Sequence, residues 1–110
     1  MIFIVAKMQV RPEHADHWPA LMGEFTLATR AEPGNVSFDW SRSLEDPNLY
    51  VLVEAFADGA AGEAHVTSDH FQAAMGALPR LLAEVPEIVN VEIPDGWSRM
   101  SEVQVDRSGD

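Results

Sequence analysis

The segment of residues 49–56, LYVLVEAF, constrains the fold most, because this predicted strand is apolar on both faces. Side chains alternate between the two faces of a strand. One face would carry Tyr50, Leu52 and Phe56, and the other Leu49, Val51, Val53 and Ala55. The predicted strands at 2–10 and 87–93 show the same two-sided pattern. An antiparallel sheet of this kind must be covered on both faces.

The order of the predicted elements defines the fold class. An amphipathic helix follows the first strand from residue 12 to the turn at Pro33-Gly34, and a second strand at 35–41 forms a hairpin with 49–56. A helical segment at 60–85 comes next, with a break near Thr67-Ser68, Ser68 as a cap and a kink at Pro79. The order β-α-β-β-α-β predicts an α+β, ferredoxin-like fold, an antiparallel sheet with both helices on one face.

The second apolar face of this sheet predicts a homodimer. Both predicted helical segments belong to one side, so a second copy of the chain is expected to cover the other side. We expect residues 1–95 to form one domain and residues 96–110 to form a polar C-terminal tail.

Composition excludes several classes of partner. The net charge of −11 argues against binding to nucleic acid or to an anionic membrane, since both require a basic face. The chain has no cysteine, and no apolar run approaches the roughly 20 residues that span a bilayer. The apolar N-terminus lacks the basic lead-in of a signal peptide, so a cytoplasmic location is expected.

The candidate site lies at the junction between the third strand and the second helical segment. Glu54 interrupts an apolar run, and a buried carboxylate requires a partner. It is expected either to form a structural salt bridge or helix cap, or to hydrogen-bond His65 and set its tautomer. His65 is the candidate general base or substrate contact, with a structural role as the alternative, and His70 is expected to be structural or exposed.

No dedicated metal site is expected from the histidine spacing. His65 and His70 are five residues apart, a rotation of about 500° that puts them on different faces of one continuous helix. A break at Thr67-Ser68 could bring them together, but no further ligand cluster is evident. His14 and His17 have helical i, i+3 spacing and could take an adventitious ion.

Aromatic side chains could line a pocket between sheet and helices, or could simply be core. Trp40 suits the wall of a site for a planar aromatic ligand. Asn35 is a further candidate contact, although strand alternation puts it opposite Trp40, where it could instead touch a partner subunit. The candidate substrate-binding residues are Trp40, Tyr50, Phe71, Met75 and Asn35.

Three segments, EPGNVSFDW, LYVLVEAFAD and EAHVTSDHF, resemble the antibiotic biosynthesis monooxygenase family. Its signature is an E-x-G turn, a strand ending in Glu plus an aromatic residue, and a His followed by a His/Phe pair. The matching residues are Glu32, Gly34, Glu54, Phe56, His65, His70 and Phe71. The resemblance covers about residues 1–95 and implies a dimeric α+β barrel.

The resemblance implies a cofactor-independent monooxygenase that oxidises a quinol, anthrone or similar electron-rich phenol with O₂. The haem-degrading branch fits less well, because Met75 occupies the place of its histidine and Ala6 and Lys7 replace its strand asparagine. His65 would act as base, with Glu54 as its orienting residue. The alternatives are a non-catalytic aromatic-ligand-binding or stress-response barrel, and a proton-transfer isomerase acting on a small carbonyl compound.

Overall fold

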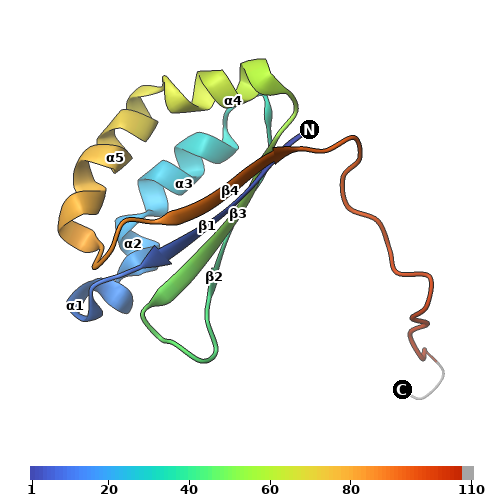
Figure 1. Cartoon of the computed structure of the whole chain (residues 1–110), viewed down its shortest axis with the longest axis horizontal. Helices are drawn as coiled ribbons and strands as arrows, with labels where there is room; N and C mark the ends of the chain where they lie inside the picture. The colour runs from blue at the N-terminus through green and yellow to red at the C-terminus, as the bar shows by residue number, and fades with distance from the viewer. Residues whose placement is uncertain (108–110) are drawn as a thin grey trace.

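The four strands pair into one antiparallel sheet with the order β2-β3-β1-β4 (Figure 1). The computed structural model describes residues 1–107. The strands are β1 (Ile2–Gln9), β2 (Asn35–Arg42), β3 (Leu49–Phe56) and β4 (Glu87–Glu92). β1 is central and pairs with β3 on one side and β4 on the other. The α+β, ferredoxin-like arrangement predicted from the sequence is confirmed.

The first helical region is divided, which corrects the single helix expected after residue 12. It consists of α1 (Pro12–Ala15), α2 (Trp18–Leu21) and α3 (Gly23–Arg30). Proline has no N–H and its ring clashes with the carbonyl four residues earlier. In one continuous helix the ring of Pro19 would clash with the carbonyl of Ala15, four residues earlier. α1 therefore ends at Ala15, and α2 begins separately at Trp18.

The second helical region has the predicted break. α4 (Gly59–Val66) ends just before Ser68, whose hydroxyl caps α5 (Asp69–Leu81) by accepting the Phe71 N–H at 3.2 Å. α5 runs through Pro79 and ends at Leu81, earlier than the expected residue 85. The Arg11 guanidinium donates to the carbonyls of Pro79 and Leu82 at this end.

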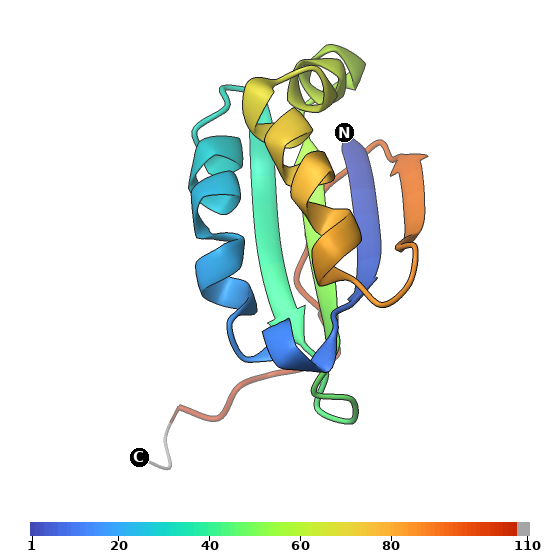
Figure 2. The same ribbon diagram turned by 90° about the vertical axis from the view of Figure 1, so that its left-hand side faces the viewer.

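The helices all lie on one face of the sheet, where the core forms (Figure 2). Trp18 is fully buried there, and Phe38 and Leu52 face it from the strands. Apolar burial of this kind is the main favourable term in folding. None of the helices in residues 1–107 is long and apolar enough to cross a membrane.

The opposite face of the sheet is apolar and has no helix over it in the described part of the chain. The strand register places Val5 beside Val53 and Val89, and Val89 and Val91 are 62% and 43% exposed. At one end Trp97 packs edge-on against Phe3, with 6.2 Å between ring centroids.

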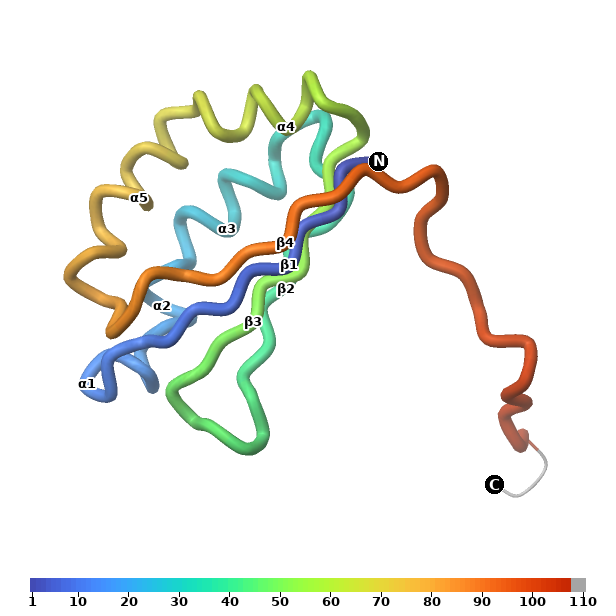
Figure 3. Tube along the Cα trace, viewed as in Figure 1, coloured from blue at the N-terminus to red at the C-terminus, as the bar shows by residue number. Residues whose placement is uncertain are grey.

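Beyond Trp97 the chain leaves the domain on the side away from the helices (Figure 3). Its apolar side chains at Met100, Val103 and Val105 are exposed. The last three residues of the predicted tail, 108–110, lie outside the described residues.

Ser68→Ala should lower the free energy of unfolding by about 1 kcal/mol, because the N-cap acceptor of α5 is lost. Ser68→Thr, which keeps a hydroxyl in that position, is the matched control. Urea denaturation followed by circular dichroism measures both variants. An equal decrease in the free energy of unfolding in Ser68→Ala and Ser68→Thr would contradict a capping role for the hydroxyl.

Candidate functional site

The imidazole of His65 is enclosed under the helices by aromatic rings. It lies in the last turn of α4 and is only 3% exposed. Phe56 approaches to 4.8 Å and Phe71 to 5.1 Å between ring centroids, and Phe25 stacks at 5.8 Å. The ring is therefore shielded from solvent on several sides.

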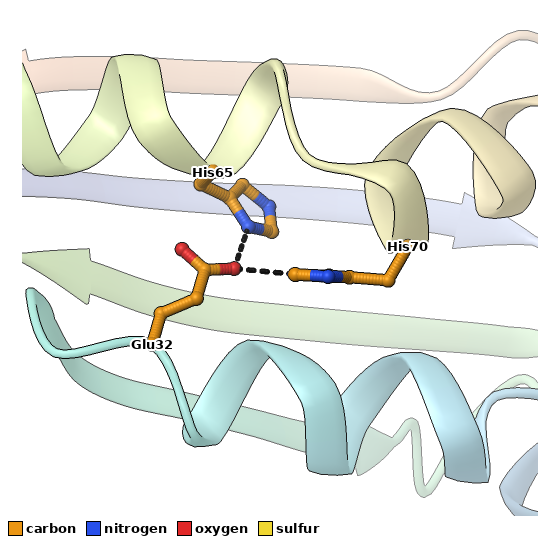
Figure 4. A group of neighbouring side chains, drawn as sticks. All are labelled: Glu32, His65 and His70. Atoms are coloured by element: carbon orange, nitrogen blue, oxygen red, sulfur yellow. Dashed lines mark hydrogen bonds and ion pairs between the residues drawn. The ribbon is translucent and has the colours of Figure 1, made fainter.

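Glu32 holds this imidazole from the turn that follows α3. Its Oε2 lies 2.8 Å from Nδ1 of His65 and 2.6 Å from Nε2 of His70 (Figure 4). An ionised carboxylate can only accept hydrogen bonds, so both rings donate to it. In neutral His65 the proton is then on Nδ1, and Nε2 keeps its lone pair.

This geometry corrects the expectation that Glu54 hydrogen-bonds His65 and sets its tautomer. The Glu54 Oε1 atom lies 3.8 Å from Nε2 of His65, which is too long for a hydrogen bond. Glu54 is on the helix-facing side of β3 and lies near Nε2, while Glu32 approaches Nδ1. The carboxylate that hydrogen-bonds His65 is Glu32, a residue of the E-x-G turn for which the sequence predicted no role.

Gly34 allows the turn that contains Glu32 to pack closely against α4. A Cβ at position 34 would clash with the Cβ of Ala61 in α4. The Gly34 carbonyl also accepts the Ala57 N–H at 2.9 Å, which fixes the turn to the end of β3. The E-x-G spacing is therefore the sequence feature that goes with the Glu32–His65 contact. The close approach of Gly34 to Ala61, on which the contact depends, is seen only in the tertiary structure.

The helix break brings His65 and His70 to the same carboxylate. α4 ends at Val66 and α5 begins at Asp69, so the rotation of one continuous helix does not apply. Ligand atoms of Glu32, His65 and His70 all lie within 4.8 Å of one another. Two imidazoles and one carboxylate are a donor set that divalent transition metals accept.

A mostly apolar cavity of about 300 Å³ adjoins His65 between the sheet and α5. Phe71 and Met75 lie in its wall; their contact with a substrate stays a prediction. Three polar side chains reach it, namely Glu54, His65 and Asn90. Asn90 is not among the residues predicted from the sequence; the register of β4 places it opposite Ile4 on the helix-facing side.

The structure does not place the other three candidate contacts at this cavity. Trp40 donates its Nε1–H to Thr26 Oγ1 at 3.0 Å and lines a separate cavity that Tyr50 also borders. The Tyr50 hydroxyl donates to the Ala15 carbonyl at 2.8 Å within the core. The Asn35 amide donates to the Ser37 carbonyl, where the β2 register shifts. Their hydrogen bonds are used within the fold.

Burial raises the pKa of the Glu54 carboxyl to about 7, and the nearby negative charge of Glu32 adds to the effect. Glu54 therefore exchanges its proton near neutral pH. It shares the cavity wall with the imidazole of His65, so an acid and a base meet beside one apolar space.

The structure is a small α+β domain with a buried imidazole beside an apolar cavity. The family model for antibiotic biosynthesis monooxygenase matches residues 1–77. The chain belongs to that family.

Individual relatives agree with the assignment. The chain is 27% identical over 95 residues to the Bacillus subtilis protein named "Putative monooxygenase YcnE", covering 86% of this chain and 100% of that protein. The structure of Rv0793 from Mycobacterium tuberculosis is similar, with a TM-score of 0.79, 25% identity and coverage of 88% and 98%. A crystal structure described as an antibiotic biosynthesis monooxygenase shares the fold at a TM-score of 0.77 and 24% identity, with coverage of 86% and 100%.

Glu54→Gln should stabilise the protein at pH 8 and have little effect near pH 4.5. The folded state binds the Glu54 proton more tightly than the unfolded chain does. Its stabilising contribution is thus present below about pH 4.5 and lost as pH rises through about 7. The difference between a pKa of 4.5 in the unfolded chain and about 7 in the folded protein corresponds to at most about 3 kcal/mol in the free energy of unfolding.

Thermal and urea unfolding of both proteins at several pH values, with a chelator present, measures this difference. The exposed Glu45→Gln is the matched control and should follow the wild type. A stability difference between Glu54→Gln and wild type that does not change with pH would contradict the assignment.

Proposed function

We propose that this chain is a cofactor-independent monooxygenase that oxidises a quinol, anthrone or similar electron-rich phenol with O₂. Family membership supports the class of reaction. The observation that carries the proposal is the apolar cavity of about 300 Å³, with the His65 imidazole in its wall. Its apolar lining suits an aromatic substrate, and a substrate bound there would displace water from the reacting atoms.

His65 is the general base in this proposal. Its Nε2 lone pair is available because Nδ1–H donates to Glu32 at 2.8 Å. Nε2 takes the phenolic proton, and the ionised Glu32 stabilises the imidazolium that forms. Glu32 does not need to take a proton itself, as in other carboxylate–histidine pairs.

The phenolate then supplies electrons to O₂. One electron passes to O₂, and the superoxide and substrate radical combine into a peroxide at a ring carbon. The O–O bond breaks, one oxygen atom stays on the ring as a carbonyl, and the other leaves as water with two substrate hydrogens. In this proposal a neutral Glu54 carboxyl, whose Oε1 lies 3.8 Å from His65 Nε2, donates a proton to the departing oxygen.

His65→Ala should reduce O₂ uptake with a reduced naphthoquinone by about 100-fold or more, because the general base is lost. Oxygen consumption in an electrode, with no metal or flavin added, measures the effect, and circular dichroism checks the fold. The exposed His17→Ala is the control and should retain full uptake. Unchanged uptake in His65→Ala would remove His65 from the reaction.

A proton-transfer isomerase acting on a small carbonyl compound is the second candidate. The raised pKa of Glu54 favours it, because an acid and a base flank one cavity. Proton transfer does not require oxygen. Isotope exchange from a carbonyl substrate into solvent under anaerobic conditions would support this candidate over the oxygenase.

We also propose that the chain forms a homodimer through the outer face of the sheet. Val5, Val53 and Val89 lie side by side there, and Val89 is 62% exposed. The outer face of β2 is polar at Asp39 and Ser41, so the apolar area is confined to β3, β1 and β4. A two-fold contact lets one such patch cover its own copy.

Val53→Glu should convert the dimer into a monomer at micromolar concentration, because it would bury a charge within the apolar contact. Ser41→Glu, on the polar edge of the same face, is the matched control and should remain dimeric. Analytical ultracentrifugation measures both. A wild-type protein that sediments as a monomer would contradict the proposal.

A further inference from the structure

We propose that Glu32, His65 and His70 form a binding site for one divalent transition-metal ion, with zinc as the typical occupant. The inference does not depend on the oxygenation reaction. It rests on the convergence of these three side chains, on the partners they lack, and on the charge around them.

The three ligand atoms come from three different parts of the chain. Glu32 lies in the turn after α3, His65 in α4 and His70 in α5 (Figure 4). Their Oε2, Nδ1 and Nε2 atoms all lie within 4.8 Å of one another. A carboxylate with two imidazoles is a set found in zinc sites that keep a fourth position for water.

The second carboxylate oxygen of Glu32 has no partner, which supports the proposal that an ion binds here. Its Oε1 is buried and has no hydrogen-bond partner. A buried acceptor without a partner costs free energy. An ion bound by both carboxylate oxygens would satisfy Oε1 as well as Oε2.

The charge around His65 also favours a cation. Glu32 and Glu54 approach its two ring nitrogens, at 2.8 and 3.8 Å. Within residues 1–107, no arginine or lysine forms an ion pair with either carboxylate. A divalent ion would compensate the negative charge of Glu32, and that of Glu54 in the fraction of molecules in which it is ionised.

The present N···O distances are those of hydrogen bonds, so binding an ion requires both imidazole rings to shift. Zinc ligands at bond lengths of about 2.0–2.2 Å lie about 3.3 Å apart in tetrahedral geometry. The N···O distances of 2.8 and 2.6 Å must therefore lengthen by about 0.5 and 0.7 Å, while His65 Nδ1 and His70 Nε2, now within 4.8 Å of each other, must approach to about 3.3 Å. His70 is 26% exposed, so it has room to move and leaves a route of entry for the ion.

A bound ion would take the place of the two ring hydrogens that His65 and His70 now donate to Glu32. Each ring can keep its single proton by moving it to the opposite nitrogen, which is Nε2 for His65 and Nδ1 for His70. Nε2 of His65 would then be protonated and unable to accept a substrate proton. A bound ion and the base proposed above therefore exclude each other.

Titration of chelator-treated protein with Zn²⁺ and with Co²⁺ tests the site. Calorimetry should give one ion per chain, and Co²⁺ should show the visible absorption of a tetrahedral site. His70→Gln and Glu32→Gln should each weaken binding by about 100-fold or more. His14→Gln/His17→Gln, which removes the other closely spaced histidine pair, should bind as the wild type does.

Two results would overturn the proposal. One is the absence of stoichiometric binding to the wild type. The other is binding that survives in His70→Gln and Glu32→Gln but is lost in His14→Gln/His17→Gln. Because His70 is partly exposed, His70→Gln is expected to fold, and circular dichroism checks this. All of these readouts are independent of turnover.

Discussion

The ionised carboxylate of Glu32, which accepts hydrogen bonds from two imidazoles, is the interaction on which the site depends. It fixes the His65 proton on Nδ1 and leaves Nε2 available near Glu54. It also joins α4 and α5 to the turn after α3, so one contact fastens three separate segments. Without it, a nearly fully buried imidazole would have no fixed tautomer.

The sheet divides its two faces between different tasks. The helix-facing side holds the cavity and the buried imidazole, because α4 and α5 cover β1 and β3 there. The outer side exposes valines that no other part of residues 1–107 covers. A second copy is our proposal for that face, and it would leave the cavity inside each subunit.

Strand pattern and capping signals were sufficient for most of the architecture, whereas the candidate contacts were less predictable. Phe71 and Met75 line the cavity, but Trp40 and Tyr50 border another and make internal hydrogen bonds. The alternation of β2 identifies which face Trp40 lies on, but not which helix covers that part of the sheet. Asn90 was not predicted as a cavity residue, because its place in the cavity wall depends on the pairing of β4 with β1.

The sequence by itself determined the element order, the two apolar faces of the sheet and the Ser68 cap, because these depend on periodicity and neighbouring residues. Only the tertiary structure decided which carboxylate holds His65. Glu32 and His65 are 33 residues apart in the chain. Their contact requires the turn at Gly34 to pack against Ala61, and no local pattern specifies that approach. The same is true of His70, because the direction of α5 after the break depends on packing against the sheet and α3.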